Sequence, residues 1–144
     1  MVTFFMKKIA LFILVTFFIS TYSYAAKFNW SKVVESADDS TIFYIDKKTV
    51  FKFDKYIYFW QLSDYIIVED PEYEKSVITL MKADCERIEV KWISLAAYEK
   101  NMGKGSLINE FLVPDDQPDQ FTWKQYDKIT TNQGVIINKA CKLR

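Results

Sequence analysis

Residues 76–98 read SVITLMKADCERIEVKWISLAAY, and this stretch predicts the centre of a β-sheet. After the polar residues 84–87, apolar and polar side chains alternate, which is typical of a half-buried strand. Before them, residues 77–81 place apolar side chains on both faces, as in a central strand. The stretch therefore predicts an antiparallel hairpin with Cys85 at its tip.

The N-terminal segment has the composition of a secretory signal peptide. A short basic region precedes an apolar run over residues 9–19, and Ser23 and Ala25 supply the small side chains before the expected cleavage site. The apolar run is shorter than the roughly 20 residues of a bilayer-spanning helix. We therefore predict a signal peptide over residues 1–25, a single domain over residues 26–144, and no integral membrane segment after cleavage.

The two cysteines predict a disulfide. Export would place Cys85 and Cys141 in an oxidising compartment, where disulfides persist. Only one intramolecular pairing is possible, and in the chain-entropy model a loop of this length contributes roughly 4 kcal/mol to stability. The alternative is a metal site, which two cysteines make poorly in a chain without histidine.

The rest of the chain predicts short strands joined by turns, followed by one helix. Strands are expected at residues 30–35, 41–45, 55–67, 108–113 and 121–124, with a connector at 49–54 and a turn at 99–107. Thr131 or Asn132 would cap the helix, for which a last strand at residues 135–137 is the alternative.

These elements predict the fold class. It is α+β, with six or so short strands in a single antiparallel β-sheet and a C-terminal helix that lies on one face and is tethered by the disulfide. We expect Trp60 or Trp92 to be buried beneath this helix.

Neither the composition nor the motifs indicate an enzyme. The chain has no histidine, which removes Ser-His-Asp and Cys-His nucleophile systems, and its three glycines are too few for a phosphate-binding loop. Asp115, Asp116 and Asp119 lack the spacing of a calcium loop, so a solvated loop is preferred. We therefore expect no cofactor and no metal. Equal numbers of acidic and basic residues, 19 of each, give no case for nucleic acid.

Two groups of polar side chains are candidate functional residues. Asp46, Asp64 and Tyr65 lie among apolar strand residues and are expected to form a structural polar network. A carboxylate pair for glycoside hydrolysis, made of the two aspartates, is the weaker alternative. The second group is a basic cluster of Lys47, Lys48, Lys52 and Lys55.

The basic cluster is interleaved with Phe51 and Phe53. It suits an acidic partner such as a glycan or a lipid headgroup, and a solvated face is the alternative. Aromatic residues make up 17% of the chain, more than one small core needs, so we expect some at the surface as binding anchors. The segment is predicted to contribute to binding of a protein partner or to self-association as a homodimer.

Short motifs are spread over nearly the whole of the predicted domain. They are Trp30, residues 44–46 (YID), residues 60–65 (WQLSDY), Ser76, Asp84-Cys85, Ser94, Met102-Gly103, Trp123 and Cys141. In this order they resemble the surface-adhesin protein E family of Gram-negative bacteria. The resemblance implies a single bent six-stranded antiparallel β-sheet, with the C-terminal helix tethered to its concave face by the disulfide. It also implies an outer-membrane adhesin that binds host extracellular-matrix or serum proteins.

Two functional hypotheses follow. The first is an exported protein-binding module of the adhesin type, which holds a partner by a sheet edge or an aromatic patch. The second is a soluble periplasmic protein, an inhibitor or accessory subunit without host contact. The absence of a lipidation cysteine near the expected cleavage site favours the second. In either case the expected location is the periplasm or the outer surface of a Gram-negative bacterium.

Overall fold

The computed structural model describes residues 28–68, 70, 72–114 and 123–144. The predicted signal peptide lies outside the described residues. So do Asp115, Asp116 and Asp119 and the first two residues of the strand expected at 121–124.

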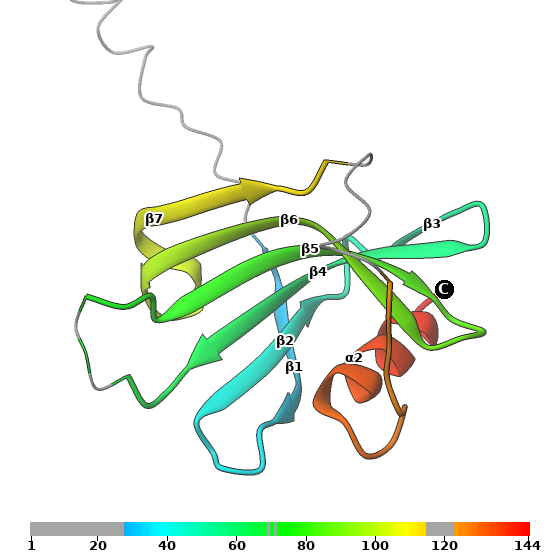
Figure 1. Cartoon of the computed structure of the whole chain (residues 1–144), viewed down its shortest axis with the longest axis horizontal. Coiled ribbons are helices and arrows are strands. Elements are labelled where there is room, and N and C mark those ends of the chain that lie inside the picture. The colour runs from blue at the N-terminus through cyan, green and yellow to red at the C-terminus, as the bar shows by residue number, and fades with distance from the viewer. Residues whose placement is uncertain (1–27, 69, 71, 115–122) are drawn as a thin grey trace, which may run out of the picture.

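The described residues form one curled antiparallel sheet (Figure 1), whose main path runs β1–β2–β4–β5–β6–β7. The bounds are β1 Trp30–Glu35, β2 Thr41–Asp46, β4 Tyr56–Tyr65, β5 Ser76–Asp84, β6 Glu89–Lys100 and β7 Lys104–Leu112. Two short strands extend it at one end, where β3 (Phe51–Phe53) pairs with β4 and β8 (Lys124–Gln125) pairs with β6. The predicted six-stranded antiparallel sheet is confirmed.

The central hairpin consists of β5 and β6, as the sequence predicts. Met81 pairs with Trp92 and Asp84 pairs with Glu89, so Cys85 begins the turn at the tip. Most β5 side chains are buried. β5 has a strand on each side, Met81 and Ala83 belong to the core beneath the C-terminal helix, and Ser76 and Ile78 on the other face lie against Gly103, which explains the nearly continuous apolar sequence of β5.

The helix α2 (Asn132–Cys141) begins where Thr131 caps it. Thr131 Oγ1 accepts a hydrogen bond from the backbone N–H of Gly134 at 3.0 Å, as expected of an N-cap threonine. A glycine normally weakens a helix. Here a Cβ at Gly134 would lie 1.8 Å from the backbone oxygen of Asp127, so only glycine lets the preceding loop pass this close. The predicted helix is confirmed, and the alternative strand is wrong.

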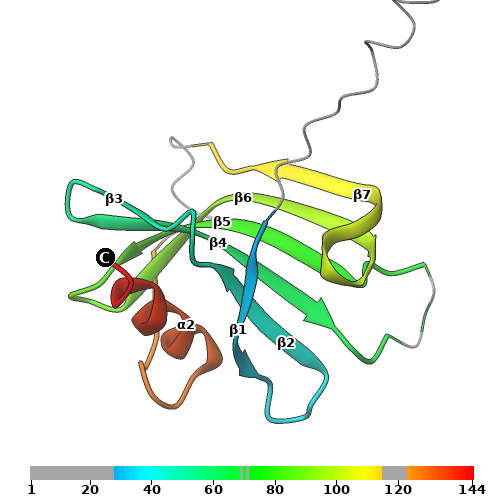
Figure 2. The ribbon, with the colours of Figure 1, turned by 180° about the vertical axis from the view of Figure 1, so that it is seen from behind.

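The main core lies between α2 and one face of the sheet (Figure 2). Ile136 of α2 is fully buried and clusters with Ile57 and Phe59 of β4. A disulfide between Cys85 and Cys141, with a Cα–Cα distance of 5.9 Å, ties the end of α2 to the tip of the central hairpin. The tethered helix that the sequence predicts is therefore present.

Two predictions of local structure are wrong. Residues 49–54 are more than a connector, because Phe51–Phe53 pairs with β4 as the strand β3. The turn predicted at residues 99–107 is only the short 3-10 helix η1 (Asn101–Gly103), after which β7 begins at once. Both strands are exposed along their whole length, so neither shows the apolar alternation that identifies a half-buried strand.

The two tryptophans expected beneath the helix are placed differently. Trp60 lies on the face of β4 opposite Phe59, and its ring is 5.4 Å from that of Phe28. Trp92 is 36% exposed. The helix packs on the face that carries Ile57 and Phe59, and because side chains along β4 alternate, Trp60 lies on the other face. Trp92 pairs with Met81 of the core and so lies on the helix side of the sheet, but it is exposed.

Candidate functional site

β7 is an exposed edge strand. All nine of its residues are exposed, and within the described part of the chain it hydrogen-bonds to β6 on one side only. Four large apolar side chains show 42% to 69% of their surface: Leu107, Ile108, Phe111 and Leu112. Proteins normally shorten, charge or cover such an edge, because its backbone can pair with another chain. Only Lys104 and Glu110 are charged in β7, which makes it a candidate binding strand.

A buried polar network fixes the turn into β7. Oδ1 of Asp64 accepts hydrogen bonds from the backbone N–H of Met102 at 2.7 Å and from Nδ2 of Asn101 at 3.2 Å. Ser76 Oγ accepts one from the backbone N–H of Gly103 at 2.9 Å. Met102 has φ 60°, a conformation that L-residues adopt rarely. Asp64 and Ser76 therefore hold a strained turn that sets where β7 starts.

Tyr65 belongs to the same region. Its backbone oxygen accepts a hydrogen bond from Nδ2 of Asn101 at 2.9 Å, so Asn101 links Tyr65 to Asp64. Burial raises the pKa of the Tyr65 phenol, and the charge of Glu74 raises it further. Asp64 makes its contacts through its side chain and Tyr65 through its backbone oxygen, so a structural role for the Tyr65 side chain stays a prediction.

Asp46 closes a different turn, between β2 and β3. Its Oδ1 accepts a hydrogen bond from the backbone N–H of Lys48 at 3.1 Å. Asp64 pairs with Ile42, which precedes Asp46 by four residues in β2, so the two aspartates are separated by about 13 Å along the strand. A carboxylate pair for glycoside hydrolysis needs a separation of about 5 to 9.5 Å. The structure therefore does not bring the two aspartates together.

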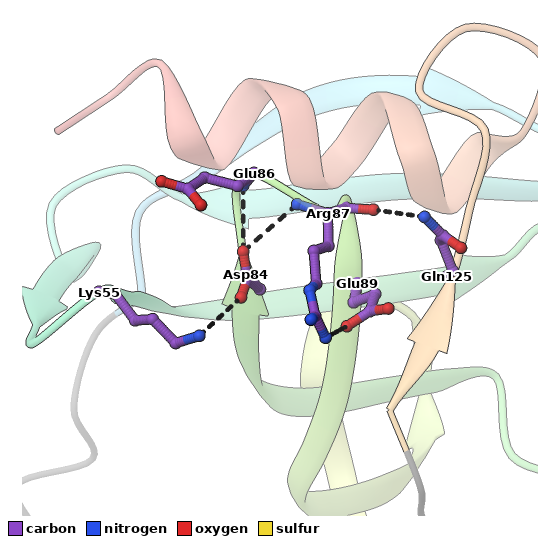
Figure 3. A network of polar contacts seen from close by, with 6 residues as sticks. All are labelled: Lys55, Asp84, Glu86, Arg87, Glu89 and Gln125. Atoms are coloured by element: carbon purple, nitrogen blue, oxygen red, sulfur yellow. Dashed lines mark hydrogen bonds and ion pairs between the residues drawn. The ribbon is translucent and has the colours of Figure 1, made fainter.

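A third aspartate, Asp84, organises the tip of the central hairpin (Figure 3). Its Oδ1 accepts hydrogen bonds from the backbone N–H groups of Glu86 at 3.0 Å and Arg87 at 3.3 Å, and its Oδ2 pairs with Lys55 Nζ at 3.4 Å. Burial raises the pKa of Asp84, but the hydrogen bonds from Arg87 and Glu86 and the nearby Lys55 outweigh burial, so the net pKa is lowered. The sequence indicates Asp84 only as a family motif. An aspartate at the start of a turn often accepts hydrogen bonds from the backbone of that turn, and this pattern could have predicted the role of Asp84.

The four predicted binding lysines lie along one segment. Lys47 and Lys48 are in the β2–β3 turn, Lys52 is in β3 and Lys55 is in the β3–β4 turn, and all four are exposed. Lys55 differs from the others because it pairs with Asp84 and so ties this segment to the central hairpin. Binding by the cluster stays a prediction.

An aromatic face lies on the side of the sheet away from α2, and Lys55 Nζ reaches it, 5.1 Å from the Tyr56 ring centroid. It consists of Phe51, Phe53, Tyr56, Tyr58, Lys82 and Trp123. The Phe51 ring stacks on Tyr58 with centroids 4.9 Å apart, and Tyr56 stacks on Trp123 at 5.2 Å. Tyr58 pairs with Phe51 on one side and with Lys82 on the other, which brings the lysine among the rings. The sequence does not indicate Lys82, because its neighbours come from strands that are distant along the chain.

The described residues contain neither a metal-ligand cluster nor a membrane-spanning helix. No group of three or more histidine, cysteine, aspartate or glutamate residues is arranged there to hold a metal ion. Nor does any helix in residues 28–68, 70, 72–114 and 123–144 combine the length and apolarity needed to cross a bilayer.

A comparison with protein-family models found a match to surface-adhesin protein E over residues 30–142. The chain belongs to the surface-adhesin protein E family. The match runs from the start of β1 to the residue after α2, so the family domain includes β7, the aromatic face and the disulfide. Family membership confirms the resemblance that the sequence motifs indicate.

Solved structures of Haemophilus influenzae protein E are similar to this member of the surface-adhesin protein E family. Crystal form II of that protein shares 13% identity with a TM-score of 0.49, and the alignment covers 79% of this chain and 96% of that chain. Protein E from non-typeable Haemophilus influenzae shares 15% identity with a TM-score of 0.43, covering 78% and 83% of the two chains. A comparison with curated protein sequences found no match.

Proposed function

We propose that this protein is an exported protein-binding module of the bacterial cell envelope, of the adhesin type, that binds a partner along β7. Membership of the surface-adhesin protein E family supports protein binding as its activity. The exposed edge of β7 is the observation that carries the choice of surface. Host extracellular-matrix or serum proteins are the partners that the family resemblance implies.

Strand addition explains how β7 would bind. An extended segment of the partner would lie beside β7, and its backbone would complete the hydrogen bonds of the sheet edge. Leu107 pairs with Tyr98 and Leu112 pairs with Ser94, which places these two leucines on the same face of the sheet despite the bulges between β6 and β7. These side chains would select apolar residues of the partner.

The buried turn before β7 favours such binding. Asp64 and Ser76 hold η1 in one conformation, so the start of β7 is ordered before a partner arrives. A binding strand that is already ordered loses less conformational entropy on association. The network of Asp64, Ser76 and Asn101 would thus contribute to affinity without contacting the partner.

The test replaces the apolar side chains of the edge. Leu107→Ser with Leu112→Ser should weaken binding to immobilised extracellular-matrix or serum proteins by about tenfold or more, because exposed apolar anchors dominate interfaces. Ile66→Ser with Ile67→Ser is the matched control, since these residues are 51% and 62% exposed in the loop after β4. Equal binding by both variants and the parent protein would place the binding surface elsewhere.

Localisation separates the adhesin from the soluble periplasmic inhibitor or accessory subunit. Protease treatment of intact cells should remove a surface-displayed adhesin and spare a periplasmic protein. N-terminal sequencing of the envelope protein should begin at Ala26, as cleavage after Ala25 predicts. A chain that keeps its N-terminal segment would contradict the proposed export route.

A further inference from the structure

The hairpin of β3 and β4 carries an unusual run of exposed residues. Residues 51–55 are all exposed, and Phe51 and Phe53 show 49% and 69% of their surface. Figures 1 and 2 both show this hairpin at the end of the molecule away from the turn between β6 and β7. Its surface is therefore separate from the start of the proposed binding strand.

The two phenylalanines are the outer row of the aromatic face. They pair with Tyr58 and Tyr56, so that all four rings lie on one side of the sheet, and Trp123 stacks on Tyr56. Tyrosine and tryptophan are favoured at the boundary between bilayer and water, where one part of the ring is apolar and another can hydrogen-bond. The purely apolar rings of Phe51 and Phe53 are therefore the outermost, and the amphipathic rings of Tyr56, Tyr58 and Trp123 lie behind them.

Cationic groups lie at the level of these rings. Lys82 Nζ is 4.4 Å from the centroid of Tyr56, and Lys55 Nζ is 5.1 Å from the same ring. Within residues 47–55 there are four lysines, and Asp54 is the only acidic residue. Exposed aromatic side chains beside lysines are suited to a bilayer with anionic headgroups. The rings can enter its apolar part, and the lysines are attracted to its negative charge.

We propose that this hairpin docks on an anionic phospholipid surface. Phe51 and Phe53 enter the boundary between headgroups and acyl chains, and the neighbouring lysines meet the lipid phosphates. A projecting hairpin with exposed phenylalanines and lysines fits a planar, negatively charged surface.

The proposal goes beyond protein binding by β7 and does not depend on it. Docking through the hairpin would hold the protein at a membrane without a lipidated cysteine. Because the hairpin projects away from the turn that begins β7, a membrane contact there would leave that part of the edge strand accessible to a partner.

The experiment is flotation of the processed protein, purified from the cell envelope, with phosphatidylethanolamine vesicles that contain or lack phosphatidylglycerol. The parent protein should float with the anionic vesicles. Phe51→Ser with Phe53→Ser should lower the vesicle partition coefficient by about tenfold or more, because two large apolar side chains no longer leave water. The control Ile66→Ser with Ile67→Ser should bind as the parent does.

Two further variants separate docking from folding. Phe53→Trp should retain vesicle binding, since tryptophan is favoured at the interface. Lys47→Ser, Lys48→Ser and Lys52→Ser together should weaken binding at low salt, with the difference shrinking at high salt; Lys55 is kept because it pairs with Asp84.

Three results would overturn the proposal. One is equal flotation with neutral and anionic vesicles, and another is parent-like flotation of the serine variant of Phe51 and Phe53. The third is parent-like flotation of the triple lysine variant at low salt. If the phenylalanine variant loses its near-ultraviolet circular-dichroism spectrum, the Phe53→Trp and lysine variants decide the question.

Discussion

Replacing Cys85 and Cys141 together by serine should lower the free energy of unfolding by about 4 kcal/mol. The bond joins residues that are 56 positions apart. In the chain-entropy model a cross-link of this span removes about 14 cal/mol/K of entropy from the unfolded chain, which corresponds to about 4 kcal/mol at 25 °C. A domain of this size has a total stability of about 5–15 kcal/mol, so the loss would be a large fraction of it.

The packing of α2 determines how the loss would appear. Ile136 and Ile137 are fully buried in the main core, so the helix cannot leave the sheet without exposing apolar surface. We therefore expect the variant to fold with α2 in place and to unfold in one transition at lower denaturant. A separate early loss of helix would show that the disulfide, and not the core, holds α2 on the sheet.

The assay is urea unfolding followed by far-ultraviolet circular dichroism and tryptophan fluorescence. Parent protein treated with a reductant is the matched control, because it loses the same bond without a change of sequence. Its stability should agree with that of the double serine variant. A loss below about 1 kcal/mol in both samples would refute the reasoning from loop closure, since the model requires about four times as much.

Three further predictions concern single residues. Gly134→Ala should destabilise the protein by about 1–3 kcal/mol in urea unfolding, although alanine is the better helix former, because the added Cβ would meet the backbone of Asp127; a more stable variant would contradict this. Asp64→Ala should cost about 1–3 kcal/mol by leaving the buried N–H of Met102 without its acceptor, and an unchanged melting temperature would argue against it. The pKa of Asp84 is lowered in the folded state, so its stabilising effect is present above the usual value of 3.8 and is lost as the pH falls through the lowered value. Acid titrations of stability should therefore fall less steeply for Asp84→Asn than for the parent, and parallel curves would refute the assignment.

The central part of the fold could be predicted from the sequence because its patterns are strong and local. The buried β5 and the alternating β6 meet at a polar turn, and the register places Cys85 at that turn. The helix could be predicted from Thr131 and the apolar residues that follow it. The sequence does not explain why a glycine stands at position 134 of the helix. The structure does, because the backbone of Asp127 passes too close for a Cβ.

The candidate surfaces were harder to predict, because one has no buried side chains to give a pattern and the other depends on pairing between strands that are distant in the sequence. β7 is exposed on both faces, so its sequence alternates weakly and resembles a turn. The aromatic face depends on cross-strand pairing, in which Tyr58 lies between Phe51 and Lys82. Composition indicates a surplus of aromatic residues, but only the register shows that they gather on the side away from α2.

Hydrogen exchange of β7 tests the central claim most directly. The protein would be measured alone and in complex with the extracellular-matrix or serum protein that it retains in the immobilised binding assay. Strand addition predicts that amides in residues 104–112 exchange more slowly in the complex, because the added strand forms hydrogen bonds along the edge. Unchanged exchange in residues 104–112, with protection elsewhere in the chain, would contradict the account.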